Sequence, residues 1–375
     1  MNRTEVRAKF PYLQNGIVYF NHASTGPVTS DVASRLSNLL KEKSEIKMDD
    51  YSSFLKVMDE TKILLAHLIN CSDDRLAFID NTSNGLNILA QSIEWKSGDR
   101  ILLNDIEFPA NVYPFLNLKR FGVEVDFVKS ENGIVTAEQI INSIKPETRL
   151  VSVSFVQFLS GYKIDLEKIG NYCRANNIIF SVDGIQGIGA MRIDVKKSKI
   201  DFLSSGTQKW LMGMQGLAFI YVDADFQRQM IPANVGWLSV ENAWDLLDYK
   251  MDLKTTANVF QGGTLNSFGI YAFNTSLKLF SDFGFDNIET EILSNTKYFI
   301  SKLKSIGLNC VLENCDDEEL AGIITIKPND AEKLFAELEK EQIICSLREG
   351  FIRFSPHFYN THHEIDKVVD ELYKK

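Results

Sequence analysis

Three residues of the chain, Lys209, Asp183 and Gln186, have the side chains needed to hold one aldehyde cofactor. Asp183 and Gln186 follow the apolar residues 178–182, and Lys209 lies in a turn after a second strand-like run, residues 201–204. A lysine amine forms a Schiff base with an aldehyde, and an aspartate keeps a pyridine nitrogen protonated so that the ring can accept electrons. This set of residues therefore predicts a site for pyridoxal phosphate.

Short apolar runs alternate with amphipathic stretches between residues 75 and 222. Such alternation predicts crossover units and an α/β fold with a mainly parallel sheet. Ligands of such sheets lie beyond the carboxyl ends of the strands, so we expect Asp183, Lys209 and Thr82 at one edge. The predicted strands are residues 76–79, 100–103, 123–128, 150–155, 178–182, 201–204 and 218–222.

The last third of the chain has a different pattern. Between residues 268 and 306 apolar side chains such as Ile270, Phe273 and Leu277 recur at steps of three and four, which predicts helix. Beyond this stretch, short strands and helices predict a smaller α+β domain. The predicted strands are residues 322–326, 343–346 and 351–354, and the predicted helices are residues 330–340 and 363–373.

The composition of the chain limits the kinds of partner that it binds. A net charge of −10 over 375 residues gives no basic surface for nucleic acid or an acidic membrane. The five cysteines are scattered without C-x-x-C spacing, which predicts a reducing compartment, no disulfide frame and no metal site. Because no apolar run approaches about 20 residues and the N-terminus has no signal-peptide core, we expect a cytoplasmic protein without a membrane segment.

Two motifs carry a resemblance to a known family. The D-G-x-Q segment at residues 183–186 and the S-G-x-Q-K-W turn at residues 205–210 resemble the class V aminotransferase family of pyridoxal-phosphate enzymes, which includes cysteine desulfurases, selenocysteine lyases, isopenicillin epimerases and kynureninases. The resemblance covers nearly the whole chain and implies fold type I, with a large domain whose sheet lies between helices. It implies that residues 21–267 form this domain, that residues 268–375 form a connecting helix and the small C-terminal domain, and that residues 1–20 pack on the small domain.

The family's phosphate site matches residues 81–87. This segment opens a helix, whose free N–H groups and dipole attract an anion, and Thr82 and Ser83 add hydroxyl donors. Plain N-capping of the helix by Thr82 or Ser83 is the alternative. Gln208 stands where desulfurases often have a histidine that touches the phosphate, so we expect its amide to donate there.

Residues 262–266 resemble the family's G-T-x-N loop, which reaches the phosphate of the neighbouring subunit. The resemblance thus implies that Thr264 contacts the cofactor of a partner chain and that the enzyme is a homodimer with a shared active site. A glycine-rich turn without such a contact is the alternative.

The family also implies how the ring of the cofactor is held. Phe108 stands where desulfurases place a histidine over the ring, and a phenyl ring can stack there but cannot relay protons. An ordinary core position is the alternative for Phe108. Phe158 replaces an asparagine that helps to hold a cofactor oxygen and the substrate, and the neighbouring Gln157 is the candidate to take over that contact.

The expected substrate is a small α-amino acid. Residues 353–361 match the family's R-x-S-x-x-x-Y-N-T pattern, whose arginine clamps the α-carboxylate, a bidentate task that suits the guanidinium of Arg353. Arg348 is a second candidate. His22, in a segment that resembles the loop closing over the substrate, is a candidate for a further contact.

The family's reactions share one first step. The amino acid enters as an external aldimine and displaces Lys209, whose amine then takes the Cα proton. Desulfurases carry a cysteine on a loop between an R-x-G turn and the carboxylate arginine, but here residues 348–350 lead directly into residues 351–353, and Cys345 precedes the turn. We therefore expect β-elimination of the C–S lyase type or transamination without a protein cysteine. The alternatives are an amino-acid epimerase, a persulfide-type desulfurase and a catalytically silent binding protein.

Overall fold

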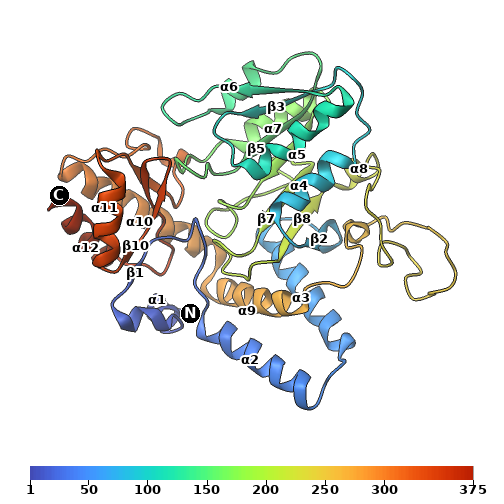
Figure 1. Ribbon diagram of the computed structural model, residues 1–375, viewed down its shortest axis with the longest axis horizontal. Coiled ribbons are helices and arrows are strands. Elements are labelled where there is room, and N and C mark those ends of the chain that lie inside the picture. The colour runs from blue at the N-terminus through green and yellow to red at the C-terminus, as the bar shows by residue number, and fades with distance from the viewer. Residues whose placement is uncertain (375) are drawn as a thin grey trace.

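The computed structural model describes residues 1–374, and Lys375 lies outside the described part. The elements that follow residue 284, dark orange and red in Figure 1, gather at one side of a larger α/β body. The helices are α1 (Arg3–Arg7), α2 (Ser30–Glu45), α3 (Tyr51–Ile69), α4 (Thr82–Gln91), α5 (Tyr113–Leu116), α6 (Ala137–Asn142), α7 (Leu166–Ala175), α8 (Ala224–Gln227), α9 (Ser267–Phe283), α10 (Phe285–Ser305), α11 (Ala331–Lys340) and α12 (His362–Tyr373).

A seven-stranded sheet forms the centre of the larger part. Its strand order is β2-β8-β7-β6-β5-β3-β4, and all neighbours are parallel except β8, which is antiparallel to both β2 and β7. The strands are β2 (Leu76–Ile79), β3 (Arg100–Asn104), β4 (Glu124–Val128), β5 (Thr148–Ser154), β6 (Ile179–Asp183), β7 (Phe202–Gly206) and β8 (Ala218–Val222). The predicted α/β class with a mainly parallel sheet is therefore confirmed.

The sheet brings the ends of three strands together at one edge. Because β2 and β7 are each antiparallel to β8, they run in the same direction, and β6 runs parallel to β7. Asp183 pairs with Ser204 across β6 and β7. Ser204 Oγ in turn donates to the carbonyl of Thr82 at 3.1 Å. The residues after these strands therefore share one rim, where ligands of parallel sheets bind.

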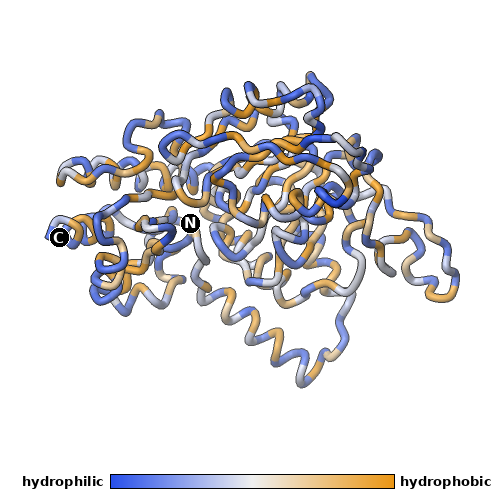
Figure 2. The backbone as a smooth tube through the Cα atoms, turned by 45° about the horizontal axis from the view of Figure 1, so that its top comes forward, coloured by the Kyte–Doolittle hydropathy of each residue, from blue (hydrophilic) through white to orange (hydrophobic). Residues whose placement is uncertain are grey.

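Apolar side chains fill both faces of the sheet. Phe219 and Tyr221 of β8 belong to the larger core cluster, whereas Ile220 and Val222 belong to the smaller one. This alternation follows from the two-residue period of a strand. Figure 2 shows hydrophobic segments running through the middle of the molecule. Burial on both faces is typical of a sheet that lies between helices.

The helical stretch expected at residues 268–306 consists of two helices. α9 ends at Phe283 and α10 begins at Phe285, with Gly284 between them at φ +96°. Residues with a Cβ rarely adopt this conformation, so the glycine allows the chain to turn between the helices. Ile270 and Phe273 are fully buried, as their spacing predicts.

The smaller part contains short strands of its own. β9, β11 and β12 form an antiparallel sheet in the order β11-β12-β9, and β1 pairs with β10 in parallel. The strands are β1 (Val18–Tyr19), β9 (Ile324–Ile326), β10 (Ile343–Ile344), β11 (Ser346–Arg348) and β12 (Phe351–Phe354). The smaller C-terminal α+β part is thereby confirmed.

The first twenty residues contact this C-terminal part at several points. β1 adds its strand to β10, Arg7 binds Glu364 at 2.9 Å, and the hydroxyls of Tyr12 and Tyr359 are 2.9 Å apart. These contacts support the predicted packing of residues 1–20. The domain boundaries after residues 20 and 267 stay a prediction.

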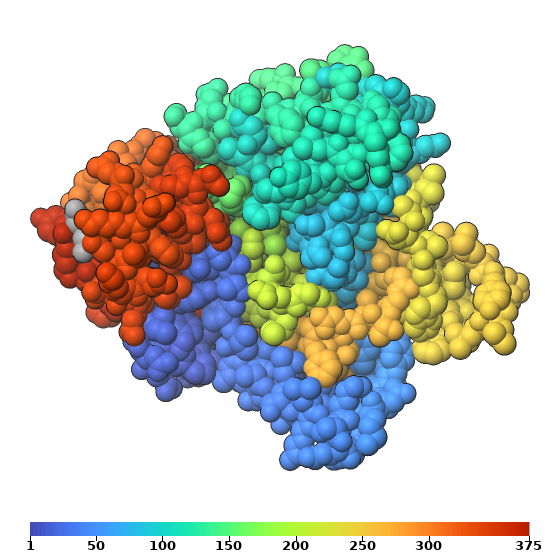
Figure 3. All heavy atoms as spheres, in the orientation of Figure 1, coloured from blue at the N-terminus to red at the C-terminus, as the bar shows by residue number. Residues whose placement is uncertain are grey.

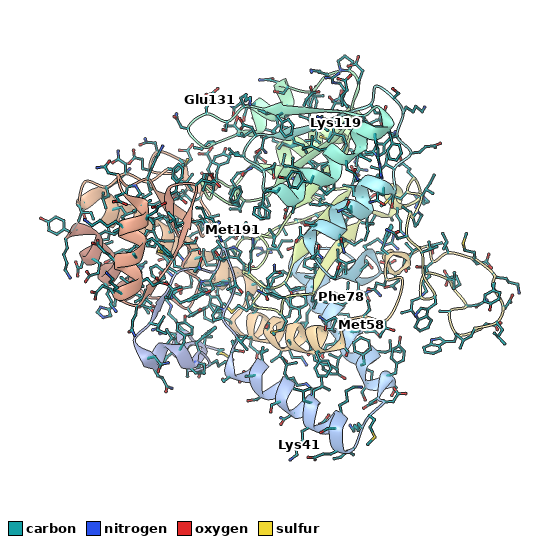
Figure 4. All side chains as sticks on the ribbon, in the orientation of Figure 1. Lys41, Met58, Phe78, Lys119, Glu131 and Met191 are labelled. Carbon is teal, nitrogen blue, oxygen red and sulfur yellow. The ribbon has the colours of Figure 1, made fainter. Side chains whose placement is uncertain are left out.

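Residues 231–256, here called the arm, extend from the body between α8 and Ala257 (Figures 1 and 3). A single backbone bridge within the arm joins Val240 to Leu253. Its side chains project outward from the loop (Figure 4). Its exposed large apolar residues are Ile231, Val235, Trp237, Trp244, Leu246, Leu247, Tyr249 and Met251. An apolar surface of this kind is typical of contact with another molecule.

Candidate active site

A cleft of about 630 Å³ opens at the rim of the sheet, against the smaller part. The N-terminal loop, the loop after β3, the turn after β7 and the β11–β12 hairpin all contribute to its walls. The lining residues are Ala23, Ser24, Asp105, Ile106, Glu107, Phe108, Pro109, Phe158, Leu159, Gln186, Lys209, Arg348, Glu349 and Arg353. The cleft thus brings four predicted site residues, Phe108, Gln186, Lys209 and Arg353, to one cavity.

Lys209 lies in the turn that follows β7, and its side chain is partly buried. Its Nζ is 5.7 Å from the centre of the Phe108 ring. Burial lowers the pKa of Lys209 to about 8, Asp183 opposes this shift, and the cations of Arg353 and Arg348 add to it. A substantial share of this amine is therefore neutral near pH 7 to 8, as an aldehyde-binding nucleophile and a general base require.

Asp183 ends β6 beneath the cleft and is 1% exposed. Its Oδ1 accepts the backbone N–H of Ile185 at 3.0 Å, whereas Oδ2 is buried without a hydrogen-bond partner. Burial raises the pKa of Asp183 to about 7, Glu107 raises it further, and Lys209 lowers it. A buried carboxylate oxygen without a donor is costly, so a protonated ring nitrogen suits this position.

The start of α4 suits a phosphate. Thr82 is buried, and its hydroxyl has no hydrogen-bond partner, whereas Ser83 is exposed. Asn81 caps the helix by accepting the N–H of Asn84 at 2.9 Å. The alternative that Thr82 or Ser83 is the N-cap is therefore wrong, because Asn81 fills that role. The helix N-terminus and the unused hydroxyl of Thr82 remain available to an anion.

The rings of Phe108 and Phe158 form one wall of the cleft. Their centroids are 5.3 Å apart at an interplanar angle of 75°. Phe108 is 43% exposed, so the alternative of an ordinary core position is wrong. An exposed phenyl face beside Lys209 suits stacking on a flat cofactor ring.

Among the cations that line the cleft, Arg353 has a guanidinium that hydrogen bonds hold in one position. It is 2% exposed, and its Nε donates to Ser346 Oγ at 3.2 Å, Nη1 to the carbonyl of Phe158 and Nη2 to Ser24 Oγ at 3.0 Å. A guanidinium has five N–H groups, so two remain, one on each terminal nitrogen. All three partners are uncharged, which leaves the positive charge for an anionic ligand. Burial lowers the pKa of Arg353 to about 10, and Arg348 adds to the shift.

Two predicted residues are already engaged with the protein. Gln186 lines the cleft, but its Nε2 donates to the carbonyl of Ala23 at 3.0 Å and its Oε1 accepts from Trp210 at 2.9 Å. Gln157 does not line the cleft and donates to Asn104 and Glu107 at 3.3 Å each. Both amides therefore position neighbouring segments.

His22 and Thr264 lie outside the cleft. His22 is fully buried, with Nδ1 2.8 Å from the carbonyl of Ser355 and Nε2 2.7 Å from the hydroxyl of Tyr359. Burial lowers the pKa of His22 to about 3. Since both ring nitrogens are used, the structure does not offer His22 to a substrate. Thr264 is exposed and lines a second cavity together with Asn84 and Asn87 of α4. Within one chain, Thr264 and Lys209 do not meet.

Gln208 directly precedes Lys209 in the turn after β7. Its backbone carbonyl accepts from Gly26 N at 2.7 Å and from the Thr25 hydroxyl at 3.3 Å. The turn is thus tied to the N-terminal loop. The side-chain amide stays a predicted phosphate donor.

Sequence reasoning missed Ser24 and Glu107, which line the cleft. The signal for Glu107 was a carboxylate directly between the apolar residues Ile106 and Phe108. For Ser24 there was no such signal, because its role depends on how the N-terminal loop approaches Arg353.

The hairpin of β11 and β12 has a two-residue turn. Arg348 pairs with Phe351, and the residues between them, Glu349 and Gly350, have φ values of +50° and +77°. Two left-handed residues in succession make the tight turn that matches the twist of paired strands. Cys345 is 4% exposed, and burial raises its pKa to about 12. The hairpin therefore has neither a loop nor a reactive thiol next to Arg353.

These features together define a fold type I pyridoxal-phosphate enzyme. A sequence profile of the family described as aminotransferase class-V matches residues 18–368. The chain belongs to this family of pyridoxal-phosphate enzymes, and its cofactor is pyridoxal phosphate.

Relatives of the chain are named after more than one reaction. A probable cysteine desulfurase of Methanothermobacter thermautotrophicus is 28% identical over 404 residues, covering 99% of this chain and 98% of the relative. An uncharacterized aminotransferase of Bacillus subtilis is 29% identical over 310 residues, covering 83% of this chain and 81% of the relative.

Solved structures share the fold over nearly the whole length. The cysteine desulfurase of Thermococcus onnurineus NA1, in its apo form, has a TM-score of 0.89 at 21% identity and covers 99% of this chain and 97% of its own. The cystine C–S lyase C-DES in complex with its product cysteine persulfide also has a TM-score of 0.89 at 21% identity, covering 97% of this chain and 99% of its own.

Neither a metal centre nor a membrane-spanning helix is found among the described residues. No group of three histidine, cysteine or acidic side chains in residues 1–374 is placed to hold a metal ion. No described helix is long and apolar enough to cross a membrane.

Proposed function

We propose that this enzyme cleaves the bond between Cβ and sulfur of an α-amino acid by β-elimination, without using a cysteine of its own. The observation that carries this proposal is the two-residue turn between β11 and β12, beside a buried Cys345. In the net reaction the sulfur leaves with the electron pair of the Cβ–S bond and takes up a proton. The remaining three-carbon fragment adds water and yields pyruvate and ammonia.

In this proposal Arg353, Lys209 and Asp183 have separate roles in the reaction. When bound, pyridoxal phosphate supplies an electron sink for negative charge at the substrate's Cα. Arg353 binds the α-carboxylate through its two free N–H groups, which orients the Cα–H bond toward Lys209. Lys209, with its pKa lowered to about 8, takes the Cα proton as a neutral amine. Asp183, whose Oδ2 is buried without a partner, would hold the proton of the ring nitrogen when the cofactor is bound.

Other side chains hold the cofactor in place. Thr82 and the N-terminus of α4 bind the phosphate, with Gln208 as a further donor. Phe108 stacks on the ring and excludes water from one face. Gln186 supports the site indirectly, because its amide fixes the loop at Ala23 and the indole of Trp210.

The second subunit of a homodimer completes the site in this proposal. Thr264 is exposed and does not line the cleft that holds Lys209, and in this proposal it contacts the phosphate of the partner chain's cofactor. The exposed apolar residues of the arm support such an assembly, because a monomer would leave them in water. A cytoplasmic location also stays a prediction.

Product analysis tests the reaction. C-DES is described as a cystine C–S lyase that forms cysteine persulfide, so L-cystine is the first substrate to assay, with L-cysteine and L-alanine beside it. We expect pyruvate and ammonia in equal amounts from L-cystine, over many turnovers and without a keto-acid acceptor. Alanine with a protein persulfide would indicate a desulfurase, and turnover that depends on an added keto acid would indicate an aminotransferase; either result contradicts the proposal.

A further inference from the structure

Glu107 is a buried carboxylate that the proposed mechanism does not use. It lies on the loop after β3, lines the cleft and is 7% exposed. Five N–H or O–H groups reach its two oxygens. Those on Oε1 are Asn104 Nδ2 at 2.6 Å, the Ser154 backbone N–H at 2.9 Å and Gln157 Nε2 at 3.3 Å, and those on Oε2 are Ser154 Oγ at 2.5 Å and Asn111 Nδ2 at 3.0 Å.

The identity of two of these donors is fixed by chemistry. The Ser154 N–H is a backbone amide and can only donate. Asn104 Oδ1 accepts from the backbone N–H of Ile106 at 3.2 Å, so the NH₂ group of Asn104 faces Glu107. Asn111 is oriented in the same way, with Oδ1 2.6 Å from the Ser152 hydroxyl.

This arrangement stabilises the negative form of Glu107. Hydrogen bonds donated to a carboxylate favour ionisation, and here every fixed neighbour is a donor. Burial, the largest effect, raises the pKa of Glu107, and the hydrogen bonds from Ser154, Asn111 and Asn104 oppose that shift. The network is thus built to hold a charge at a place where low polarity alone would keep the group neutral.

The charge of Glu107 acts on Asp183. Ser154, which donates twice to Glu107, pairs with Asp183 across β5 and β6. The charged groups that affect Asp183 are Glu107 from the loop after β3 and Lys209 from the turn after β7. Oδ2 of Asp183 is the atom without a partner, so the field of Glu107 reaches the position at which the ring nitrogen is expected.

We propose that Glu107 is a positioning residue whose buried negative charge holds a proton on the pair formed by Asp183 and the ring nitrogen of the cofactor. A second carboxylate near this pair raises its affinity for a proton, while Lys209 lowers it. Without Glu107, the remaining charge of Lys209 would favour a neutral ring nitrogen, which is a weaker electron sink. This inference rests on the role of Asp183 proposed above.

Nitrogen-15 NMR of the holoenzyme, loaded with ring-labelled pyridoxal phosphate, tests this directly because the shift reports whether the ring nitrogen carries a proton. The spectra of wild type, Glu107→Gln and Glu107→Asp are compared between about pH 6 and pH 10. Neutralising Glu107 should lower the pH at which the proton is lost by about one unit, a tenfold weaker proton affinity, whereas Glu107→Asp should stay close to wild type. Equal titration curves for wild type and Glu107→Gln, or a proton kept over the whole range in both, overturn the inference.

Two further variants separate the possible failures. If Glu107→Gln does not fold, Ser154→Ala removes one hydroxyl donor but leaves the carboxylate in place. It should shift the titration in the same direction by a smaller amount, and an unchanged curve overturns the inference. Asp183→Asn tests the underlying assignment. A ring nitrogen that stays protonated in Asp183→Asn refutes the role of Asp183, whereas loss there together with an unchanged Glu107→Gln refutes only the role of Glu107.

Discussion

Replacing Arg353 by lysine removes the proposed carboxylate site while keeping its positive charge. Three of the five N–H groups of Arg353 bind Ser346, Phe158 and Ser24, which leaves one on each terminal nitrogen for the substrate. A lysine has one nitrogen and cannot hold these partners and two carboxylate oxygens together. Losing a hydrogen bond to a charged group costs about 1.5–3 kcal/mol, so amino-acid affinity should fall roughly 10- to 150-fold.

The affinity is measured by titrating the absorbance band of the bound cofactor with L-alanine, which binds but has no leaving group on Cβ. Arg348→Lys is the matched comparison, because Arg348 also lines the cleft but is exposed. We expect its affinity to change less than about threefold, the size of a weak surface effect. Unfolding curves and cofactor content of both variants control for damage to the fold, since Arg353→Lys also leaves buried oxygens unpaired. A large loss of amino-acid affinity in Arg348→Lys, together with an unchanged affinity in Arg353→Lys, would refute the assignment of Arg353 as the carboxylate-binding residue.

Three other substitutions test separate parts of the site. Lys209→Ala should still bind the cofactor but show no borohydride-reducible link, and a persisting link would exclude Lys209 as the Schiff-base residue. Asp183→Asn should lower kcat by on the order of 10³-fold, about 4 kcal/mol in the barrier, and a loss of only about tenfold would argue against its role. His22 has its pKa lowered to about 3, so the stability it gives is present above about pH 6.5 and is lost as the pH falls toward 3. Between pH 7 and pH 5, His22 should lower the free energy of unfolding by about 2 kcal/mol. In denaturant unfolding, the free energy of unfolding of His22→Gln should therefore depend less on pH than that of the wild type. Equal pH dependence in the two proteins would contradict this.

The sheet could be predicted because each of its strands is a short apolar run bounded by polar residues. Every predicted strand between residues 76 and 222 is present, with ends moved by two residues or fewer. β6 extends to Asp183 because the ladder continues through its pairing with Ser204. A single sequence does not contain this information, since pairing partners decide where a strand ends.

The candidate site was predictable where a residue follows a strand and carries unusual chemistry, as Lys209, Asp183 and Arg353 do. The role of a residue was less predictable where that role depends on contacts within the folded chain. Gln186 and His22 bind parts of their own chain through both polar ends. Three of these four contacts join segments more than 150 residues apart, which no local pattern reveals.

Cleavage without a protein thiol is tested by comparing the products that wild type and Cys345→Ala form from L-cystine and from L-cysteine. Cys345 is buried, and the adjoining hairpin turns within two residues. We therefore expect the same rate in both proteins, within about twofold. It also predicts pyruvate as the three-carbon product in both, with no persulfide on the protein. Alanine as the main product, together with an inactive Cys345→Ala, would contradict elimination without a protein thiol.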